Sequence, residues 1–373
     1  MLKILDRYIL RAFFTNYLIA IAVMIGLYVV LDLFVNLDEF TEVEAQSTFQ
    51  MLARIVDFYG HNLFLYFAQL SGVIILVAAC FTLGRFHRTN ELIAILSSGV
   101  SLYRVATPIV VAALGMNLLW AVDQEVIIPG IAQKLARKHA DIEGRASFAI
   151  WFQPDRDNAQ LSALLFSPRT EEMRGVVILK RDESNHMREV IRADRARWDA
   201  ERNLWHLEKG FRMNFEAHDG LVREGNLAPA SGDLGRLGVT EYPSDLTPKE
   251  LGLLQATQWT MFVSLPALDK LQQRFAATGT TEFLKVKHKR MTTPFINMIL
   301  LCLGIPFFLN RERESVIRVG GHCLLLCNVC YIATFIIQGM DFTSLGAGPA
   351  LAAWIPVLLF GPLAVVMMDG IKT

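Results

Sequence analysis

Six stretches of this chain are almost free of charged side chains, and each is long enough to cross a membrane as a helix. A hydrocarbon layer about 30 Å thick is spanned by roughly 20 apolar helical residues. Only 19% of the 373 residues are charged and 53% are hydrophobic, whereas soluble domains average about 25% and about 45–50%. Six core helices of this length are not expected in a soluble chain of this size. We therefore predict transmembrane helices at residues 13–35, 63–83, 105–128, 291–310, 319–340 and 349–368.

The predicted spans form two groups of three, separated by residues 129–290. This central region holds 25 of the 36 basic and 22 of the 36 acidic residues, and it is long enough to form its own core. The predicted fold class is an α-helical membrane protein with six transmembrane helices (3+3) and an inserted domain. Its parts are a first membrane half at 1–128, the inserted domain at 129–290 and a second membrane half at 291–373.

The orientation in the membrane follows from the Lys and Arg residues next to the spans, because cytoplasmic loops are enriched in both. With a cytoplasmic N-terminus, the short outer loops carry only Arg54. The inner flanks then carry Lys3, Arg7, Arg11, Arg85, Arg88, Arg104, Arg311, Arg313, Arg318 and Lys372. We therefore expect both termini in the cytoplasm and the inserted domain on the extracytoplasmic side.

The inserted domain is predicted to consist mainly of short β-strands. Apolar or alternating runs at 161–166, 175–180, 190–193, 204–207 and 211–215 are separated by turn-forming residues. This spacing is typical of an antiparallel sandwich or jelly roll, so we expect a β-jelly-roll-like domain. Trp198 should pack across the sheet from Trp205. Residues 131–142 should extend the third span as a helix. Two further helices should begin after Thr247 and Ser264, and Gly279 should end the second of them.

The sequence contains no motif for catalysis or for ATP binding. The phosphate-binding pattern GxxxxGK[ST] and the catalytic motifs HExxH and GxSxG are absent, so we expect no cofactor bound by this chain. Asp123 and Glu125 would not face each other on a helix, and we interpret them as acids at the membrane surface. Because 36 basic residues balance 36 acidic ones, no overall positive charge indicates a nucleic-acid partner.

The five cysteines all fall within predicted spans. Cys323, Cys327 and Cys330 share one helix face, with His322 nearby. A metal site is one interpretation of this cluster, but no second segment is rich in ligands. We therefore favour small packing residues on a membrane helix.

The connection between the second and third spans is predicted to hold a short amphipathic helix at about residues 89–99. Thr89 or Asn90 can cap it, Glu91 complements its N-terminal dipole, and Gly99 can end it in a left-handed conformation. An apolar stripe runs through Leu92, Ile95 and Leu96. Such a helix either lies on lipid as a simple connector or docks on a soluble ATPase and transmits its movement.

A second candidate site is the basic run that leads into the fourth span. It consists of Lys285, Lys287, Lys289 and Arg290. These cations could contact the phosphates of a transported lipid, or they could anchor the chain to anionic headgroups.

The order and spacing of these features resemble the LptF/LptG (YjgP/YjgQ) family of lipopolysaccharide-export permeases. The likeness covers essentially the whole chain, from L-D-R-Y-I-L-R at residues 5–11 to L-G-I-P-F at residues 303–307. It includes the N-E-L…S-G-x-S run at residues 90–101, the Trp198/Trp205 hairpin and K-V-K-H-K-R-M-T-T-P at residues 285–294.

The resemblance implies a subunit without an ATPase site of its own, in the bacterial inner membrane with its β domain in the periplasm. It implies a paralogous permease partner, a cytoplasmic ABC ATPase dimer that uses ATP, and a periplasmic bridge protein that receives lipopolysaccharide. Asn90, Glu91, Leu92, Ile95 and Gly99 would form the ATPase-coupling site, with Glu91 pairing with a basic residue of the ATPase. Family members often carry a basic residue near the outer end of the first span, where this chain has Asp32. The resemblance therefore implies no phosphate contact there.

Two other classes of function share some of these features. One is a mechanotransmitting ABC-type membrane subunit that does not itself move lipid, and the other is an envelope protein whose β domain binds a partner. Neither class predicts a cavity wide enough for a lipid, and co-purified lipopolysaccharide would favour the exporter.

Overall fold

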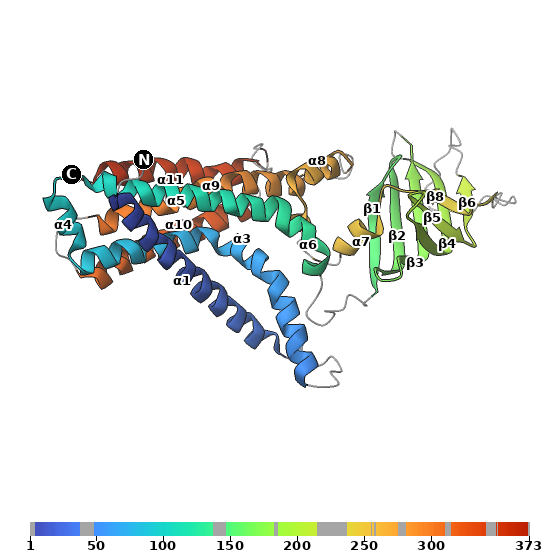
Figure 1. The fold of residues 1–373 in the computed structure, drawn as a ribbon. Coiled ribbons are helices and arrows are strands. Elements are labelled where there is room, and N and C mark those ends of the chain that lie inside the picture. The colour runs from blue at the N-terminus through green and yellow to red at the C-terminus, as the bar shows by residue number, and fades with distance from the viewer. Residues whose placement is uncertain are drawn as a thin grey trace.

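A computed structural model describes the protein at residues 4–37, 48–136, 147–182, 186–214, 237–254, 256, 259–274, 281–309, 315–340, 348 and 350–371. Within these ranges, six helices are long and apolar enough to span a membrane. Three precede a β-sheet domain and three follow it, which confirms the predicted 3+3 arrangement (Figure 1). They are α1 (Ile4–Val35), α3 (Thr48–Arg88), α5 (Leu102–Val122), α9 (Thr281–Phe308), α10 (Val316–Gly339) and α11 (Ala350–Asp369).

Several helices are longer than their uncharged stretches. The helix α3 has 41 residues and continues through polar flanks on both sides of residues 63–83. The helix α9 begins at Thr281, so the predicted domain boundary at residue 290 lies inside it. An uncharged stretch ends at the first charged residue. A helix does not end there, because its backbone hydrogen bonds can form past charged side chains. The predicted cap Gly279 and the residues Arg311 and Arg313 lie outside the described residues.

The third span changes its helical form before it leaves the bundle. After α5, residues Asp123–Ile127 form a π-helical turn, η1, and the helix α6 (Ile128–Leu135) follows. The amide of Ile128 donates to the carbonyl of Asp123, which is the wider spacing of a π-helix. Pro129 has no amide hydrogen and follows directly. Of the helical extension predicted at residues 131–142, α6 accounts for residues 131–135, and residues 137–142 lie outside the described residues.

Small residues allow α3 and α9 to approach closely. A side chain on Gly72 would collide with Asn297, and a side chain on Gly304 would collide with Leu76. Close approach at a glycine is typical of helix packing in membranes. Where the helices meet, the Asn297 amide donates to the side-chain oxygen of Asn117 at 2.9 Å, which links α9 to α5.

The three cysteines of α10 also pack inward. Cys323, Cys327 and Cys330 are buried in the hydrophobic core of the bundle. The Cys323 thiol points to the carbonyl of Gly304 and the Cys327 thiol to that of Leu300, both on α9. This agrees with the interpretation of these cysteines as packing residues.

The inserted domain is an eight-stranded sheet in which every strand pair is antiparallel. The strand order is β1-β2-β3-β4-β5-β8, and β6 pairs with both β4 and β7. The bounds are β1 (Phe148–Asp155), β2 (Ala159–Ser167), β3 (Glu172–Arg181), β4 (Met187–Asp199), β5 (Leu204–Glu208), β6 (Phe211–Asn214), β7 (Leu237–Gly238) and β8 (Glu241–Pro243). The five predicted strands correspond to β2–β6. Trp198 and Trp205 are cross-strand partners with ring centroids 5.0 Å apart, as expected.

The sequence did not predict β1, because this strand does not alternate regularly. Its register with β2 shifts twice, and Phe152 has a positive φ of 45°. The strand is nevertheless tied to the far side of the sheet through Asp155 at its end. The buried Asp155 carboxylate accepts hydrogen bonds from the hydroxyls of Ser244 at 2.6 Å and Tyr242 at 3.0 Å. Burial, and then the charge of Asp155, raise the pKa of Tyr242, so its hydroxyl stays protonated and donates.

Short helices connect the sheet to the bundle. The helix α7 (Pro248–Leu253) begins with a capping box between Thr247 and Glu250. A 3₁₀ turn, η3 (Trp259–Phe262), and the helix α8 (Leu265–Arg274) then lead back to α9. In Figure 1 the sheet lies at one end of the bundle, whereas the start of α1, the end of α11 and the short helix α4 (Glu91–Ser97) lie at the other.

Candidate coupling and lipid-contact sites

The predicted amphipathic helix is α4 (Glu91–Ser97), between α3 and α5. Gly99 has a φ of +79° and its amide donates to the Leu96 carbonyl at 3.0 Å, so the helix ends in the predicted left-handed conformation. Its start differs from the prediction. Asn90 itself adopts a left-handed conformation, with φ 58°, and its side chain caps no amide. The turn after α3 is so tight that Asn90 serves as a backbone bend instead of a cap.

The apolar stripe of α4 faces the bundle. Leu92 is buried in the hydrophobic core, and Ile95 and Leu96 pack against it. The exposed side chains of α4 are those of Ile93, Ala94 and Ser97, and Ser98 directly after the helix is also exposed. Leu92 and Ile95 therefore fix the helix in place, and any protein that docks on α4 would meet the other face.

Glu91 lies at the start of α4 and is held by two hydroxyl groups. Tyr8 of α1 donates to one carboxylate oxygen at 2.6 Å, and Thr89 donates to the other at 2.9 Å. The Tyr8 hydroxyl in turn accepts a hydrogen bond from Arg85 of α3 at 3.2 Å. The Tyr8 ring stacks on Phe86, with centroids 5.6 Å apart. Glu91 thus belongs to a polar cluster that joins α1, α3 and α4.

Residues at the opposite end of the bundle form what we call the joint: Glu125 of η1, residues 260–265 and Arg290 of α9. The Arg290 side chain is only 8% exposed. It donates to the carbonyl oxygens of Thr260, Met261 and Val263 and pairs with Glu125 at 3.4 Å. The other Glu125 oxygen accepts from the Leu265 amide at 2.8 Å. The joint therefore ties the third and fourth spans to the segment that enters from the β domain.

The joint changes the interpretation of the basic run. Arg290 was expected to be a possible contact for lipid headgroups, but its donors are directed into the protein. Lys285 lies 3.4 Å from Glu282, and Lys287 lies 2.6 Å from Asp269 of α8. Lys289 is partly buried and has no ionic partner among the described residues. The lysines, and Lys289 above all, are the members of the run that remain candidates for contacting a phosphate.

Asp123, which was interpreted as an acid at the membrane surface, is enclosed by the protein. It is 2% exposed, and neither of its carboxylate oxygens has a hydrogen-bond partner among the described residues. The two acids of η1 therefore differ, because Glu125 belongs to the joint and Asp123 is enclosed. Sequence spacing shows only that the two side chains diverge, and it does not show which of them meets a cation.

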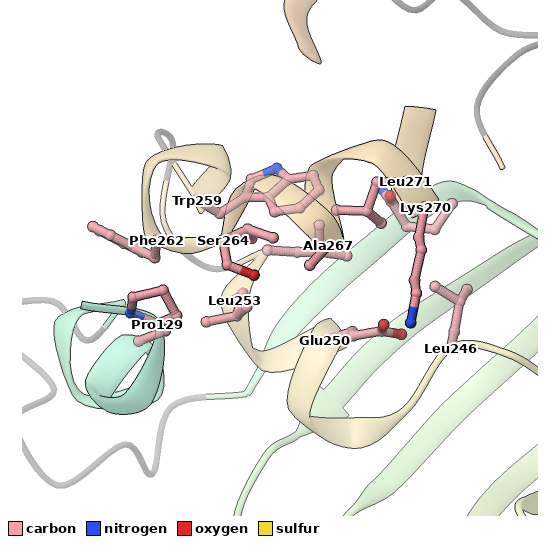
Figure 2. Close-up of a pocket in the computed structure, with 14 residues that line it drawn as sticks. Pro129, Leu246, Glu250, Leu253, Trp259, Phe262, Ser264, Ala267, Lys270 and Leu271 are labelled. Atoms are coloured by element: carbon pink, nitrogen blue, oxygen red, sulfur yellow. The ribbon is translucent and has the colours of Figure 1, made fainter. Parts of the chain in front are cut away.

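A cavity of about 260 Å³ lies beside the joint, between α6, α7, η3 and α8 (Figure 2). Most of its wall is apolar, and Glu250 and Lys270 add one charge of each sign. Its apolar lining includes Pro129, Leu246, Leu253, Trp259, Phe262, Val263 and Leu271. The β domain and the bundle thus meet through apolar side chains around a hollow, next to the buried ion pair of the joint.

The fold is that of a multi-pass membrane protein with a short helix at one end of its bundle and a β domain at the other. The sequence matches the family described as "Lipopolysaccharide export system permease LptF/LptG" over residues 7–369, which is nearly the whole chain. The protein therefore belongs to the LptF/LptG family. No individual curated protein matches it significantly. Family membership makes the chain a permease component of a lipopolysaccharide transport complex in the inner membrane, and such a component is not itself an enzyme.

Proposed function

We propose that the protein is one of two paired permease subunits in an ABC-type exporter. The exporter extracts lipopolysaccharide from the outer leaflet of the inner membrane and passes it to a periplasmic bridge protein. A cytoplasmic ATPase dimer binds and hydrolyses the ATP, and this chain binds no cofactor. The observation that carries the proposal is the family match over residues 7–369 in a chain whose α4 and β domain lie at opposite ends of the bundle.

The proposed docking site for the ATPase is the exposed face of α4. Ile93 and Ala94 offer small apolar contacts beside the serines that end the helix. Each Glu91 oxygen accepts one hydrogen bond within the chain, and a carboxylate has about four acceptor positions. Glu91 can therefore accept a basic side chain of the ATPase without leaving Tyr8.

The proposed contact with the lipid phosphates is made by Lys289, supported by Lys285 and Lys287. These residues lie on the first turns of α9, next to the joint. Each lysine near an anionic surface contributes on the order of 1 kcal/mol, so we assign the attraction to the three lysines together. Arg290 contributes by holding the joint and not by contacting lipid.

The proposed orientation places α4 in the cytoplasm and the β domain in the periplasm. We expect an impermeant maleimide to label Glu201→Cys, in the exposed turn after β4, on intact spheroplasts. Ser97→Cys on α4 should be labelled only after the membrane is permeabilised. The parent protein is the control, because its five cysteines all lie in the six spanning helices and should label weakly on both sides. The reverse labelling pattern would contradict the proposed orientation. It would also contradict the proposal that lipopolysaccharide is extracted from the outer leaflet of the inner membrane.

A further inference from the structure

Much of the apolar surface of the helix α1 is exposed, as at Val23, Val30 and Phe34. Only 11% of its most apolar window is buried, against 22–50% in the other five candidate spans of the described chain. In Figure 1 its C-terminal half diverges from α5 and α9 together with the first half of α3. Its N-terminal half, in contrast, packs into the core of the bundle through Ile9, Ala12 and Phe13, and the polar contacts at its N-terminal end lie beside this packed region.

Two polar contacts hold that N-terminal end. Asp6 pairs with Arg104 at the start of α5 at 2.7 Å. Tyr8 donates to Glu91 of α4 at 2.6 Å and accepts from Arg85 at 3.2 Å. The first contact connects two spanning helices, whereas the second connects a spanning helix directly to the helix proposed to dock on the ATPase.

The Tyr8 hydroxyl is the middle member of a directed chain of hydrogen bonds. The Arg85 guanidinium donates to it, and it donates to the Glu91 carboxylate. A donor polarised by a neighbouring cation forms a stronger hydrogen bond to an anion. The ring is fixed independently of the hydroxyl, because it stacks on Phe86 at an interplanar angle of 18°. Removing only the hydroxyl should therefore leave the packing of Tyr8 unchanged.

We propose that Tyr8 is a positioning residue for ATPase coupling, which orients the Glu91 carboxylate for the ATPase and links movement of α4 to α1. This inference rests on the proposed function, because it assumes that Glu91 meets a basic residue of the ATPase. Docking on α4 would then act directly on a spanning helix whose C-terminal half diverges from α5 and α9 (Figure 1).

The test compares single and double variants in the complex purified from membranes with its ATPase and reconstituted with lipopolysaccharide. Tyr8→Phe should lower the amount of lipopolysaccharide exported per ATP by about tenfold, the size expected for one hydrogen bond to a charged group. The ATPase rate and the amount of assembled complex should stay within about twofold, because the ring still stacks. In the Glu91→Gln background, the Tyr8 change should cost less than about twofold, since the two residues act as one unit.

Tyr103→Phe is the matched control. The Tyr103 hydroxyl donates to the Met368 carbonyl at 2.8 Å, and the residue is 38% exposed, compared with 42% for Tyr8. It lies near α4 in sequence, but its hydroxyl donates to α11 and not to α4, so its loss should leave export per ATP unchanged.

Three outcomes would overturn the inference. One is wild-type export per ATP in Tyr8→Phe while Glu91→Gln is impaired, which would leave the proposed coupling intact. Another is a Tyr8 effect of the same size in both backgrounds, which would indicate a structural role. The third is normal export in Glu91→Gln, which would contradict the coupling role of α4 and the role of Tyr8 together.

Discussion

Replacing Glu91 with lysine is expected to separate the permease from its ATPase and to abolish ATP-driven export. A charge-assisted contact contributes roughly 1.5–3 kcal/mol, and a reversed charge replaces that attraction with repulsion. The added lysine would also face Arg85, whose guanidinium donates to the Tyr8 hydroxyl beside it. Affinity for the ATPase should therefore fall by at least about a hundredfold. Co-purification of the ATPase from membranes measures the loss directly.

The matched control for Glu91→Lys is Asp369→Lys. Asp369 is an exposed acid at the end of α11, near the same end of the bundle, and no described residue pairs with it. The same charge reversal there should leave assembly and export unchanged. Normal assembly and export in Glu91→Lys would exclude α4 as the coupling site.

Replacing Arg290 with alanine is expected to cause the largest loss of stability in the chain. The substitution removes the donors for three carbonyl oxygens and leaves the Glu125 carboxylate without its cation. Breaking a buried ion pair by removing one partner costs about 3–5 kcal/mol. Arg290→Lys should recover only part of this, because an ammonium group cannot reproduce the fork of the guanidinium. Thermal unfolding in detergent and the protein level in membranes measure the effect.

The lysines of the same run provide the control. Changing Lys285, Lys287 and Lys289 together to glutamine removes more charge than Arg290→Ala does. It should nevertheless cost only about 1–2 kcal/mol, because Lys285 and Lys287 each pair with a single exposed acid, and Lys289 has no ionic partner among the described residues. The triple variant should instead lose crosslinking to lipopolysaccharide while it keeps its ATPase. If Arg290→Ala unfolds at the same temperature as the parent, or if the lysine variant is the less stable one, the joint does not have the role assigned to it.

The parts of the fold that could be predicted from the sequence are those set by local patterns. A long uncharged run of about 20 residues identifies a spanning helix because a helix satisfies all its backbone hydrogen bonds within the segment. Gly99 marked the end of α4 because glycine adopts a positive φ without strain, and it does so here at +79°. Thr247 and Glu250 formed the capping box that their spacing indicates.

The parts that could not be predicted depend on residues far apart in the chain. Arg290 and the lysines beside it look alike in sequence, yet Arg290 faces Glu125, 165 positions earlier, and the lysines do not. Tyr8 and Glu91 are separated by 83 positions, and no periodicity connects them. The strand β1 was missed for a local reason, since its register shifts remove the alternation by which strands are recognised.

The most direct test of the account is to measure the transfer of lipopolysaccharide by the reconstituted complex. Proteoliposomes would contain this chain, its paralogous partner, the ATPase dimer and lipopolysaccharide, with the soluble bridge protein outside. The account predicts that ATP transfers lipopolysaccharide to the bridge protein, and that Glu91→Lys stops the transfer while Asp369→Lys does not. A complex that assembles and hydrolyses ATP but transfers no lipopolysaccharide would contradict the account and would indicate a mechanotransmitting subunit that moves no lipid.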